Sequence, residues 1–253
     1  MTRVIKLGGR VQSDVALPAT LAAAWAASAA LVVVHGGGDE VSALQKSFGR
    51  ESAFVDGKRV TAMEDLDLLR MALSGSANQR LVATMVGAGV PAVGISGEDA
   101  GMISAVATSR VTMGEVGTPD RVDAALLHHL LAGGFCPVVS PLARDRDSTG
   151  GGVLNVNGDD AAAAIAAAIQ AADLLLISDV EGVLVAGAAV GQLDADVARQ
   201  LIRSGVARGG MAAKLEAALD ALARGVPRVR IGALRALTDD TSGTVITLAG
   251  VAV

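Results

Sequence analysis

Residues 4–9 read VIKLGG, and residues 32–38 read VVVHGGG. In each stretch a short apolar, β-branched run ends in glycines, which is the pattern of a buried strand that leads into a backbone loop. Neither loop fits the usual phosphate fingerprints, because the chain contains no G-x-x-x-x-G-K-[ST] and no G-x-G-x-x-G sequence. Two such loops near one end of the chain nevertheless predict that something anionic is held between them.

The same order of strand, loop and helix repeats along the chain. Helices are predicted at residues 16–30, from about Glu40 onwards with Asp39 as N-cap, and at 62–87, 120–131, 161–172 and 211–222. Strands are predicted at residues 4–7, 31–35, 91–96, 137–142, 174–179, 228–232 and 244–248, with a hairpin at 53–61 that turns at Asp56-Gly57 and a meander at 100–117. This alternation predicts an α/β fold with an open, mainly parallel sheet sandwiched between helices. The glycine run at 149–152 divides it into two lobes, residues 1–150 and 151–253.

Composition excludes several classes of protein. The 253 residues are 51% hydrophobic but only 2% aromatic, so the core is built from Ala, Val, Leu and Ile. The formal net charge of −5 argues against a nucleic-acid-binding surface, which needs an excess of Lys and Arg. The lone Cys136 cannot form an intramolecular disulfide, and its apolar surroundings predict a core residue rather than a nucleophile. Cysteine and histidine nowhere have metal-ligand spacing, so we expect no metal held by protein ligands alone.

Residues 15–34 carry no charge and are numerous enough to span a bilayer. Pro18 near the start, alanine rather than leucine in the middle, and the strand pattern LVVVH at the end favour a helix followed by a buried strand instead. Gln12, Ser13 and Asp14 also interrupt the apolar run that a signal peptide needs. We therefore expect a cytoplasmic protein without a membrane segment.

Charged and glycine-rich residues gather where predicted strands end. The loops concerned are 6–9, 35–38, 96–99 and 178–182. Ligands of open parallel sheets bind beyond the carboxyl ends of the strands, so these loops predict a site. Lys6, as a compact point charge just before two glycines, suits a phosphoryl group. A Gly-Gly pair alone is often only a tight turn, but four such loops at one edge favour the site.

Further polar positions each have two interpretations. Arg59 on the predicted hairpin is either a bidentate clamp for a carboxylate or an ordinary solvated charge. Alternation places Asn155, Asn157 and Asp159 on one side of their segment, where they contact a ligand or where Asp159 merely caps the next helix. Lys214 lies in a helical stretch whose other face is apolar, and such a lysine is usually solvated. Taken singly, these residues leave the alternatives open.

Taken together, they resemble one family. The segments that carry the resemblance are KLGG (6–9), HGGG (35–38), DGKRVT (56–61), GSANQRLV (75–82), AVGISGEDA (92–100), NVNGDDAA (155–162), LLLISDVEGV (174–183) and GGMAAKLEAA (209–218). In this order and at this spacing they are similar to the acylglutamate kinase branch of the amino acid kinase family. The resemblance runs from Lys6 to the closing GTVITL. Each motif alone is weak, whereas eight in order are a strong signal.

The resemblance implies roles for single positions. Lys6 and Lys214 match the family lysines that stabilise the transferring phosphoryl group, and Asp159 matches the aspartate that orients them. The positions implied for the acyl amino acid are Gly37, Gly38, Arg59, Asn155 and Asn157, with Arg59 on the α-carboxylate. The positions implied for the nucleotide are Gly8, Gly9, Ser178, Asp179, Val180, Glu181, Gly182, Val183, Leu184, Val206, Ala207 and Arg208.

The implied reaction is ATP-dependent phosphorylation of the γ-carboxylate of N-acetyl-L-glutamate, an early step of arginine biosynthesis, with Mg²⁺ bridging the nucleotide phosphates. A carboxyl group with a pKa of about 4.3 is already ionised at neutral pH, so no general base is needed. Two anions must approach each other, which requires positive potential and positioning. The two glycine loops are then opposed cradles, one for each reactant.

Three features depart from the family pattern. Only five residues precede Lys6, so the N-terminal helix of the arginine-inhibited hexamers is missing, and we expect a homodimer without arginine feedback. The stretch 184–193, LVAGAAVGQL, replaces a polar turn, which leaves the adenine contacts open. No motif fixes the acyl group. Kinases for N-succinylglutamate or for carrier-linked glutamate or aminoadipate are therefore alternatives, as is a catalytically silent relative that binds a nucleotide or metabolite. Retention of Lys6, Asp159 and Lys214 together favours an enzyme.

Overall fold

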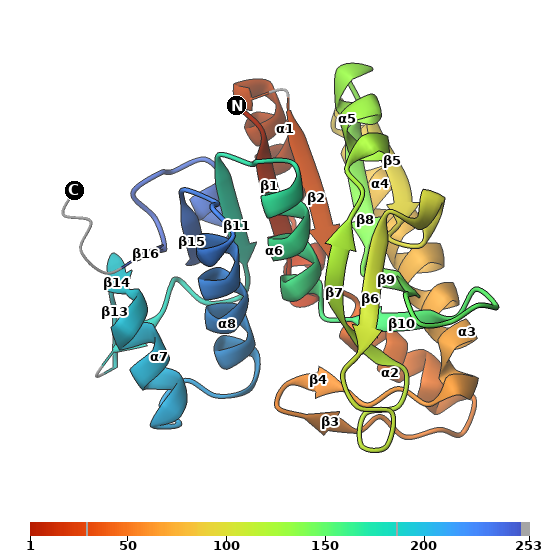
Figure 1. Cartoon of the computed structure of the whole chain (residues 1–253). Helices are drawn as coiled ribbons and strands as arrows, with labels where there is room; N and C mark the ends of the chain where they lie inside the picture. The colour runs from red at the N-terminus through yellow and green to blue at the C-terminus, as the bar shows by residue number, and fades with distance from the viewer. Residues whose placement is uncertain (29, 186, 249–253) are drawn as a thin grey trace.

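A computed structural model describes residues 1–28, 30–185 and 187–248 as a central sheet with helices on both faces (Figure 1). Ala29 and Ala186, which fall in the predicted helix 16–30 and the stretch 184–193, lie outside the described residues, as do residues 249–253. In spatial order the strands of the sheet are β14 (Gln192–Asp194), β16 (Thr244–Thr247), β15 (Val229–Gly232), β11 (Asp173–Ile177), β1 (Arg3–Leu7), β2 (Leu31–His35), β8 (Cys136–Ser140) and β5 (Ala92–Ser96). Only β15 and β16 pair antiparallel, so the predicted mainly parallel sheet is confirmed.

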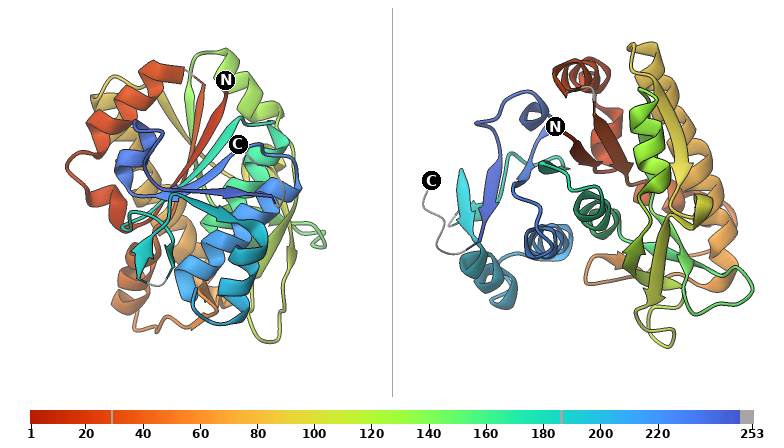
Figure 2. Two further views of the ribbon diagram at one scale, coloured as in Figure 1. Left: turned by 90° about the vertical axis from the view of Figure 1, so that its left-hand side faces the viewer. Right: turned by 45° about the horizontal axis from the view of Figure 1, so that its top comes forward.

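The central strands are apolar because helices cover both of their faces. Every residue of β2 and of β11 is buried. Helices α6 (Gly158–Ala168) and α8 (Gly209–Ala223) pack on one face, whereas α1 (Leu17–Ser28) and α4 (Asn78–Gly87) pack on the other (Figure 2). The small alanine side chains of α6 let its backbone lie close to the sheet. As a result, the first turn of α6 reaches the carboxyl end of β1.

A small closed barrel lies beside the sheet. Its strands are β6 (Ile103–Ala107), β7 (Val116–Val122), β9 (Leu142–Asp145) and β10 (Val153–Val156). The predicted meander at 100–117 therefore holds β6 and the start of β7. Two further hairpins are β3 (Phe54–Val55) with β4 (Lys58–Arg59), and β12 (Leu184–Val185) with β13 (Ala188–Ala189). In the first, Asp56 and Gly57 take positive φ values of 49° and 78°, so the predicted hairpin turn is confirmed.

Some predicted boundaries are wrong. Asp39 is not an N-cap, because α2 (Gly38–Ser47) starts one residue before it and Gly37 occupies the cap position. The helix predicted at 120–131 starts only at α5 (Ala125–Ala132), since β7 continues to Val122. Asp123 then accepts a hydrogen bond from the N–H of Ala125 and so helps the helix to begin.

Other helices differ in length or in form. The segment predicted as one helix at 62–87 is helical but changes type along its length. It consists of the 3₁₀-helical η2 (Met63–Asp65), α3 (Leu66–Leu69), the π-helical η3 (Arg70–Ala77) and α4. Helix α6 ends at Ala168 rather than at 172, and Gln170 beyond it takes a positive φ of 52°. Helix α7 (Ala195–Arg203) and the strands β9 and β14 were not predicted.

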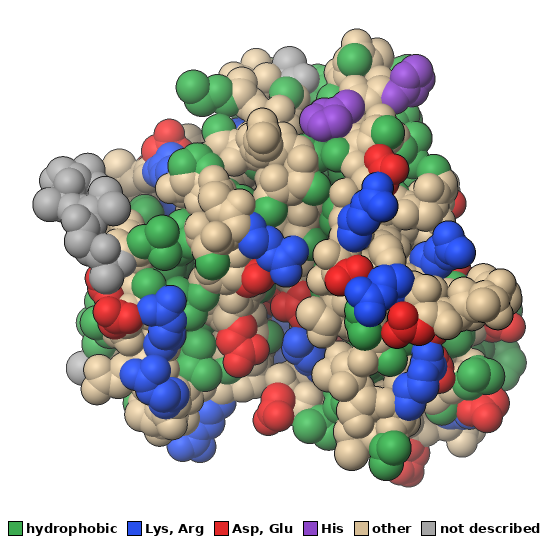
Figure 3. All heavy atoms as spheres, in the orientation of Figure 1, with side chains coloured by type: hydrophobic (Ala, Val, Ile, Leu, Met, Phe, Trp, Pro, Cys, Tyr) green, Lys and Arg blue, Asp and Glu red, His purple; other side chains and the backbone are tan. Residues whose placement is uncertain are grey.

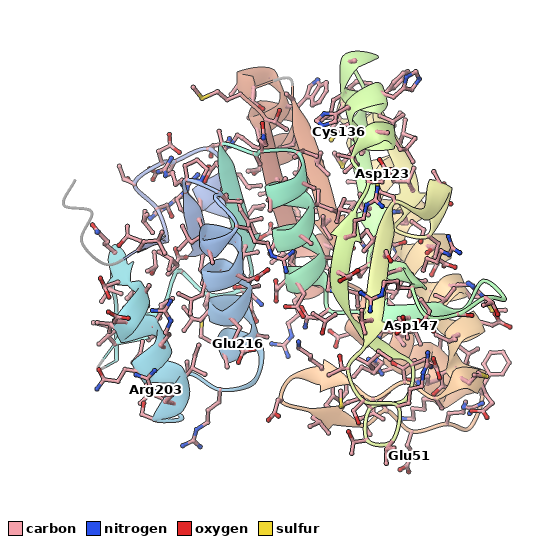
Figure 4. All side chains as sticks on the ribbon, viewed as in Figure 1. Glu51, Asp123, Cys136, Asp147, Arg203 and Glu216 are labelled. Atoms are coloured by element: carbon pink, nitrogen blue, oxygen red, sulfur yellow. The ribbon has the colours of Figure 1, made fainter. Side chains whose placement is uncertain are left out.

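Cys136 is buried at the amino end of β8 (Figure 4), and burial raises the pKa of its thiol to about 12, so the predicted core role is confirmed. Within the described part of the chain, no helix is both long enough and apolar enough to cross a membrane. Basic and acidic side chains are interspersed over the face shown in Figure 3. The division into lobes at residue 150 stays a prediction; β10, which follows it, pairs with β7 and β9, which precede it.

Candidate active site

Three charged side chains meet at the carboxyl ends of the central strands. Nζ of Lys6 lies 2.9 Å from Oδ1 of Asp159, and Nζ of Lys214 lies 3.4 Å from Oδ2 of the same carboxylate. Lys6 belongs to β1, Asp159 to the first turn of α6 and Lys214 to α8. The side chain of Lys214 is only 12% exposed, so it is not a solvated surface lysine. We call these three residues the Lys6–Asp159–Lys214 triad.

The charges of the triad depend on one another. Burial alone would raise the pKa of Asp159, but Lys6 and Lys214 outweigh it and hold that pKa below its ordinary value. Burial lowers the pKa of Lys214, and the nearby carboxylate offsets only part of this effect. Two ammonium groups against one carboxylate leave an excess of one positive charge. The triad can therefore attract an anion without losing its internal order.

The segment Asn157-Gly158-Asp159 explains how the carboxylate reaches Lys6. Asn157, not Asp159, is the N-cap of α6, and its Oδ1 accepts a 2.8 Å hydrogen bond from the N–H of Asp159. Gly158 leaves room for the lysine, because a Cβ at this position would lie 3.2 Å from Cε of Lys6. The interpretation of Asp159 as a mere helix cap is therefore wrong, since its carboxylate is free to bind the lysines.

A cavity of about 160 Å³ has Gly158, the neighbour of Asp159, in its lining. Asn155, one of the lining residues, donates a 2.9 Å hydrogen bond from Nδ2 to Oγ1 of Thr61, which fixes the amide. The polar lining of the cavity includes Gly36, Gly37, Gly38, Lys58, Arg59, Asn155, Asn157 and Gly158. The apolar lining of the cavity includes Val41, Phe54, Leu69, Leu73, Val116, Pro141 and Val156. All five positions predicted for the acyl amino acid thus border one cavity.

Arg59 is buried at the edge of this cavity and is held by helix α2 and the segment after it. Its Nη1 donates hydrogen bonds to Oε1 of Gln45 (2.7 Å) and Oγ of Ser52 (2.6 Å). Its Nη2 donates to the carbonyl oxygen of Gly38 (2.6 Å) and Oγ of Ser42 (2.8 Å). Arg59 is therefore not an ordinary solvated charge. These four bonds leave the Nε–H of Arg59 without a hydrogen-bond partner among the described residues.

A second cavity, of about 240 Å³, is lined by both lysines of the triad. Besides Lys6 and Lys214, its lining consists of Gly8, Gly9, Arg10, Val11, Gly38, Asp39, Ser178 and Asp179. Oγ of Ser178 is buried and has no hydrogen-bond partner among the described residues, so it is available to a ligand. Gly38 borders both cavities, and the two therefore meet beside the triad.

The other predicted nucleotide positions lie outside these two linings. Glu181 borders a third cavity, together with Ser178 and Asp179. Gly182 packs closely against Thr244, since a Cβ there would lie 2.6 Å from Oγ1 of that threonine. The remaining positions are Val180, Val183 and Leu184 around that glycine, and Val206, Ala207 and Arg208 between α7 and α8; neither cavity beside the triad includes them. Their role in nucleotide binding stays a prediction.

Residues 1–233 match the model of the amino acid kinase family. The chain belongs to this family. Among its relatives is a protein named acetylglutamate kinase from Chloroflexus aurantiacus, 42% identical over 93% of this chain and 93% of that protein. Another of the same name, from Roseiflexus castenholzii, is 40% identical over 98% of this chain and 95% of its own length.

Solved structures of similar fold match this chain over nearly its whole length. One is the protein smu.665 from Streptococcus mutans, with a TM-score of 0.86 and 27% identity over 97% of this chain and 98% of that one. A second is N-acetylglutamate synthase from Neisseria gonorrhoeae, complexed with coenzyme A and N-acetyl-glutamate (TM-score 0.80, 26% identity). The match covers 97% of this chain and 59% of the synthase chain. Carbamate kinase from Giardia lamblia, with 15% identity and a TM-score of 0.73, shares the fold.

Sequence reasoning missed part of the site that the amino acid kinase fold builds. Leu69 and Leu73 border the first cavity, but their three- and four-residue spacing indicated only a helix face. Gln12, His35 and Asn78 form a hydrogen-bond chain behind the HGGG loop. The one sequence signal for these hydrogen bonds was the position of His35 before the glycines, and nothing in the sequence indicated the residues to which His35 is bonded.

Proposed function

We propose that this chain transfers the γ-phosphoryl group of ATP to the γ-carboxylate of N-acetyl-L-glutamate, an early step of arginine biosynthesis. The observation that carries the proposal is the Lys6–Asp159–Lys214 triad, because its two cations line a cavity that meets a second cavity at Gly38. The family supports a kinase, and relatives named acetylglutamate kinase, about 40% identical over most of the chain, support the acceptor.

The reaction needs little covalent help from the protein. A carboxylate oxygen attacks the γ-phosphorus and forms an O–P bond, while the bond from phosphorus to the bridging oxygen breaks and ADP leaves with its electron pair. Negative charge spreads over the three equatorial oxygens of the phosphoryl group. Lys6 and Lys214 stabilise that charge, and Asp159 keeps both ammonium groups in place.

The first cavity suits the acyl amino acid. Arg59 supplies a cation for its α-carboxylate at one edge, and Asn155 supplies an amide. Val41, Leu69 and Leu73 offer an apolar surface to a short acyl group. The γ-carboxylate then points toward Gly38 and the triad, where the two cavities meet.

The second cavity suits the phosphates of ATP. The backbone N–H of Gly9, the unpartnered hydroxyl of Ser178 and the two lysines border it, whereas the N–H of Gly8 is bonded to the carbonyl oxygen of Ile177. Among the described residues, no group of three Asp, Glu, His or Cys side chains could hold a metal ion. This donor set does not fit an all-protein magnesium site, but it is compatible with Mg²⁺ carried by the nucleotide phosphates, whose charge the ion would neutralise.

A hydroxamate assay tests the proposal directly. The protein is incubated with ATP, Mg²⁺ and hydroxylamine, which traps acyl phosphates, and with N-acetyl-L-glutamate, N-succinyl-L-glutamate or free L-glutamate. We expect product with the acetylated compound alone. Replacing Lys6 by alanine should lower the rate roughly 10²–10³-fold, the loss typical of one oxyanion donor, while ATP binding persists.

Other outcomes separate the alternatives. Preference for the succinylated compound would keep the chemistry and change the substrate. Absence of product with all three compounds, together with ATP binding, would point to a carrier-linked substrate or to a catalytically silent relative. The cytoplasmic location and the homodimer belong to the proposal as well, and a hexamer in gel filtration would contradict the second of them.

A further inference from the structure

The carbonyl oxygen of Gly36 is held from two sides. Nε2 of Gln12 donates a 2.7 Å hydrogen bond to it, and Nδ1 of His35 lies 2.9 Å from it. Two donors saturate the two lone pairs of a carbonyl oxygen. The N–H of Gly36 is fixed as well, by a 3.0 Å bond to the carbonyl oxygen of Leu7 on β1. Gly36 is thus one of the most firmly oriented residues of the HGGG loop.

The proton on His35 is assigned by its neighbours. Nδ2 of Asn78 lies 3.1 Å from Nε2 of His35 and also donates to the carbonyl oxygen of Val138 at 2.9 Å. Because an amide nitrogen only donates, Nε2 of the imidazole must accept and Nδ1 must carry the proton. His35 is fully buried, and burial lowers its pKa, so the ring stays neutral at neutral pH and keeps this tautomer.

The fixed carbonyl determines where the next N–H points. The peptide bond between Gly36 and Gly37 is trans, as are all those of the described residues, so its C=O and N–H point to opposite sides. The N–H of Gly37 makes no hydrogen bond among the described residues. Gly37 borders the first cavity, next to the free N–H groups that begin α2. Its N–H is therefore a donor aimed away from Gln12 and His35.

We infer that Gln12 and His35, with Asn78 behind them, are positioning residues that hold the Gly37 N–H as a donor for the reacting groups, at the border of the first cavity beside Gly38, where the two cavities meet. Gln12 follows the first glycine loop, at Gly8-Gly9, so its bond to Gly36 also sets the distance between the two cradles. The inference rests on the proposed kinase function and adds to it, because neither side chain is among the residues that touch the reactants.

Two pairs of variants test it by steady-state kinetics with ATP and N-acetyl-L-glutamate. In the first pair, Gln12→Met keeps the length of the side chain but removes the donor, and Gln192→Met, on the distant strand β14, is the control. A misaimed donor affects the transition state more than the bound reactants. We expect kcat of Gln12→Met to fall about 10-fold with both KM values changed less than about 3-fold, and Gln192→Met to match the wild type.

In the second pair, His35→Asn and His35→Leu introduce side chains with the same branching at Cγ, one polar and one apolar. The asparagine places an amide N–H where Nδ1 of the imidazole was, whereas leucine offers no donor. We expect kcat of His35→Asn to exceed that of His35→Leu at least about 5-fold, although both proteins lose thermal stability. Equal kcat values in this pair, or wild-type kcat in Gln12→Met, would overturn the inference. The wild type has to form product first, so failure of the kinase proposal itself would be seen separately.

Discussion

Lys214 shows what a buried site does to a single charge. Its ammonium group lies 3.4 Å from Oδ2 of Asp159 and borders the second cavity, and the side chain is only 12% exposed. Burial is the larger effect, and the pKa of Lys214 lies below the ordinary lysine value. Its charge, which the reaction needs, is therefore lost at a lower pH than that of an exposed lysine.

This lowered pKa gives a prediction for the pH profile. As pH rises through the folded-state pKa of Lys214, the neutral amine no longer stabilises the phosphoryl group, and kcat should fall at a pH below about 10.4, the ordinary lysine value. Arginine stays protonated throughout. Lys214→Arg should therefore move the alkaline decline of kcat to higher pH, whatever its absolute rate. Measurement of kcat at saturating substrate over this range decides the matter, and an unmoved decline would assign it to another group.

At the scale of elements, the β3–β4 hairpin is docked on the other half of the site. Nζ of Lys58 lies 2.8 Å from Oδ2 of Asp160 on α6, and a Cβ on Gly57 would lie 3.0 Å from the carbonyl carbon of Gly209 at the start of α8. Burial raises the pKa of Asp160 despite its lysine partner. The hairpin that carries Arg59 is thus fixed against both helices of the triad.

Loss of this ion pair should weaken binding of the acyl amino acid more than it slows the chemistry. In Lys58→Met the hairpin loses its partner on α6, so we expect KM for N-acetyl-L-glutamate to rise about 3–10-fold with kcat within about 2-fold. Lys46→Met, at an exposed position of α2, serves as the matched control. A fall in kcat with unchanged KM would mean that Lys58 acts on the phosphoryl group instead.

The elements differ in how far the sequence determines them. Buried strands such as β2 and β11 were predicted because continuous Val, Ile and Leu runs have few other uses. The barrel was not predicted, because its strands are short and pair with strands that are distant in the sequence. For example, β10 pairs with β7. The triad was located only through the family motifs. Spacing alone could not show that a mid-helix lysine, Lys214, turns inward to meet Asp159.

At the scale of the whole molecule, a second charged cluster lies at the opposite end of the sheet. Arg230 on β15 is fully buried, and its Nη2 lies 3.1 Å from Oδ2 of Asp173 and 3.2 Å from Oδ1 of Asp240. Arg3 on β1 also reaches Asp173, at 3.4 Å. This cluster joins β1, β11 and β15 at their amino ends, away from the cavities.

Arg230→Met should therefore change stability but not catalysis. It leaves the carboxylate of Asp173 buried without its main partner, and we expect the free energy of unfolding to drop by about 3 kcal/mol. The expected kcat and KM at 25 °C are those of the wild type. Arg235→Met removes an exposed arginine of the same region and should cost less than about 1 kcal/mol in urea unfolding. Similar losses in both variants would contradict a special role for the buried cluster.

The docked hairpin has a thermodynamic consequence for the two reactants. Its second strand carries Arg59, which borders the first cavity, and its turn, at Gly57, packs against the start of the helix that carries Lys214. If the acyl amino acid displaces the hairpin, the helix that contacts ATP is therefore displaced as well, and the reverse also holds. Such a linkage is reciprocal: if ATP tightens the binding of the acyl amino acid by some factor, the acyl amino acid tightens the binding of ATP by the same factor.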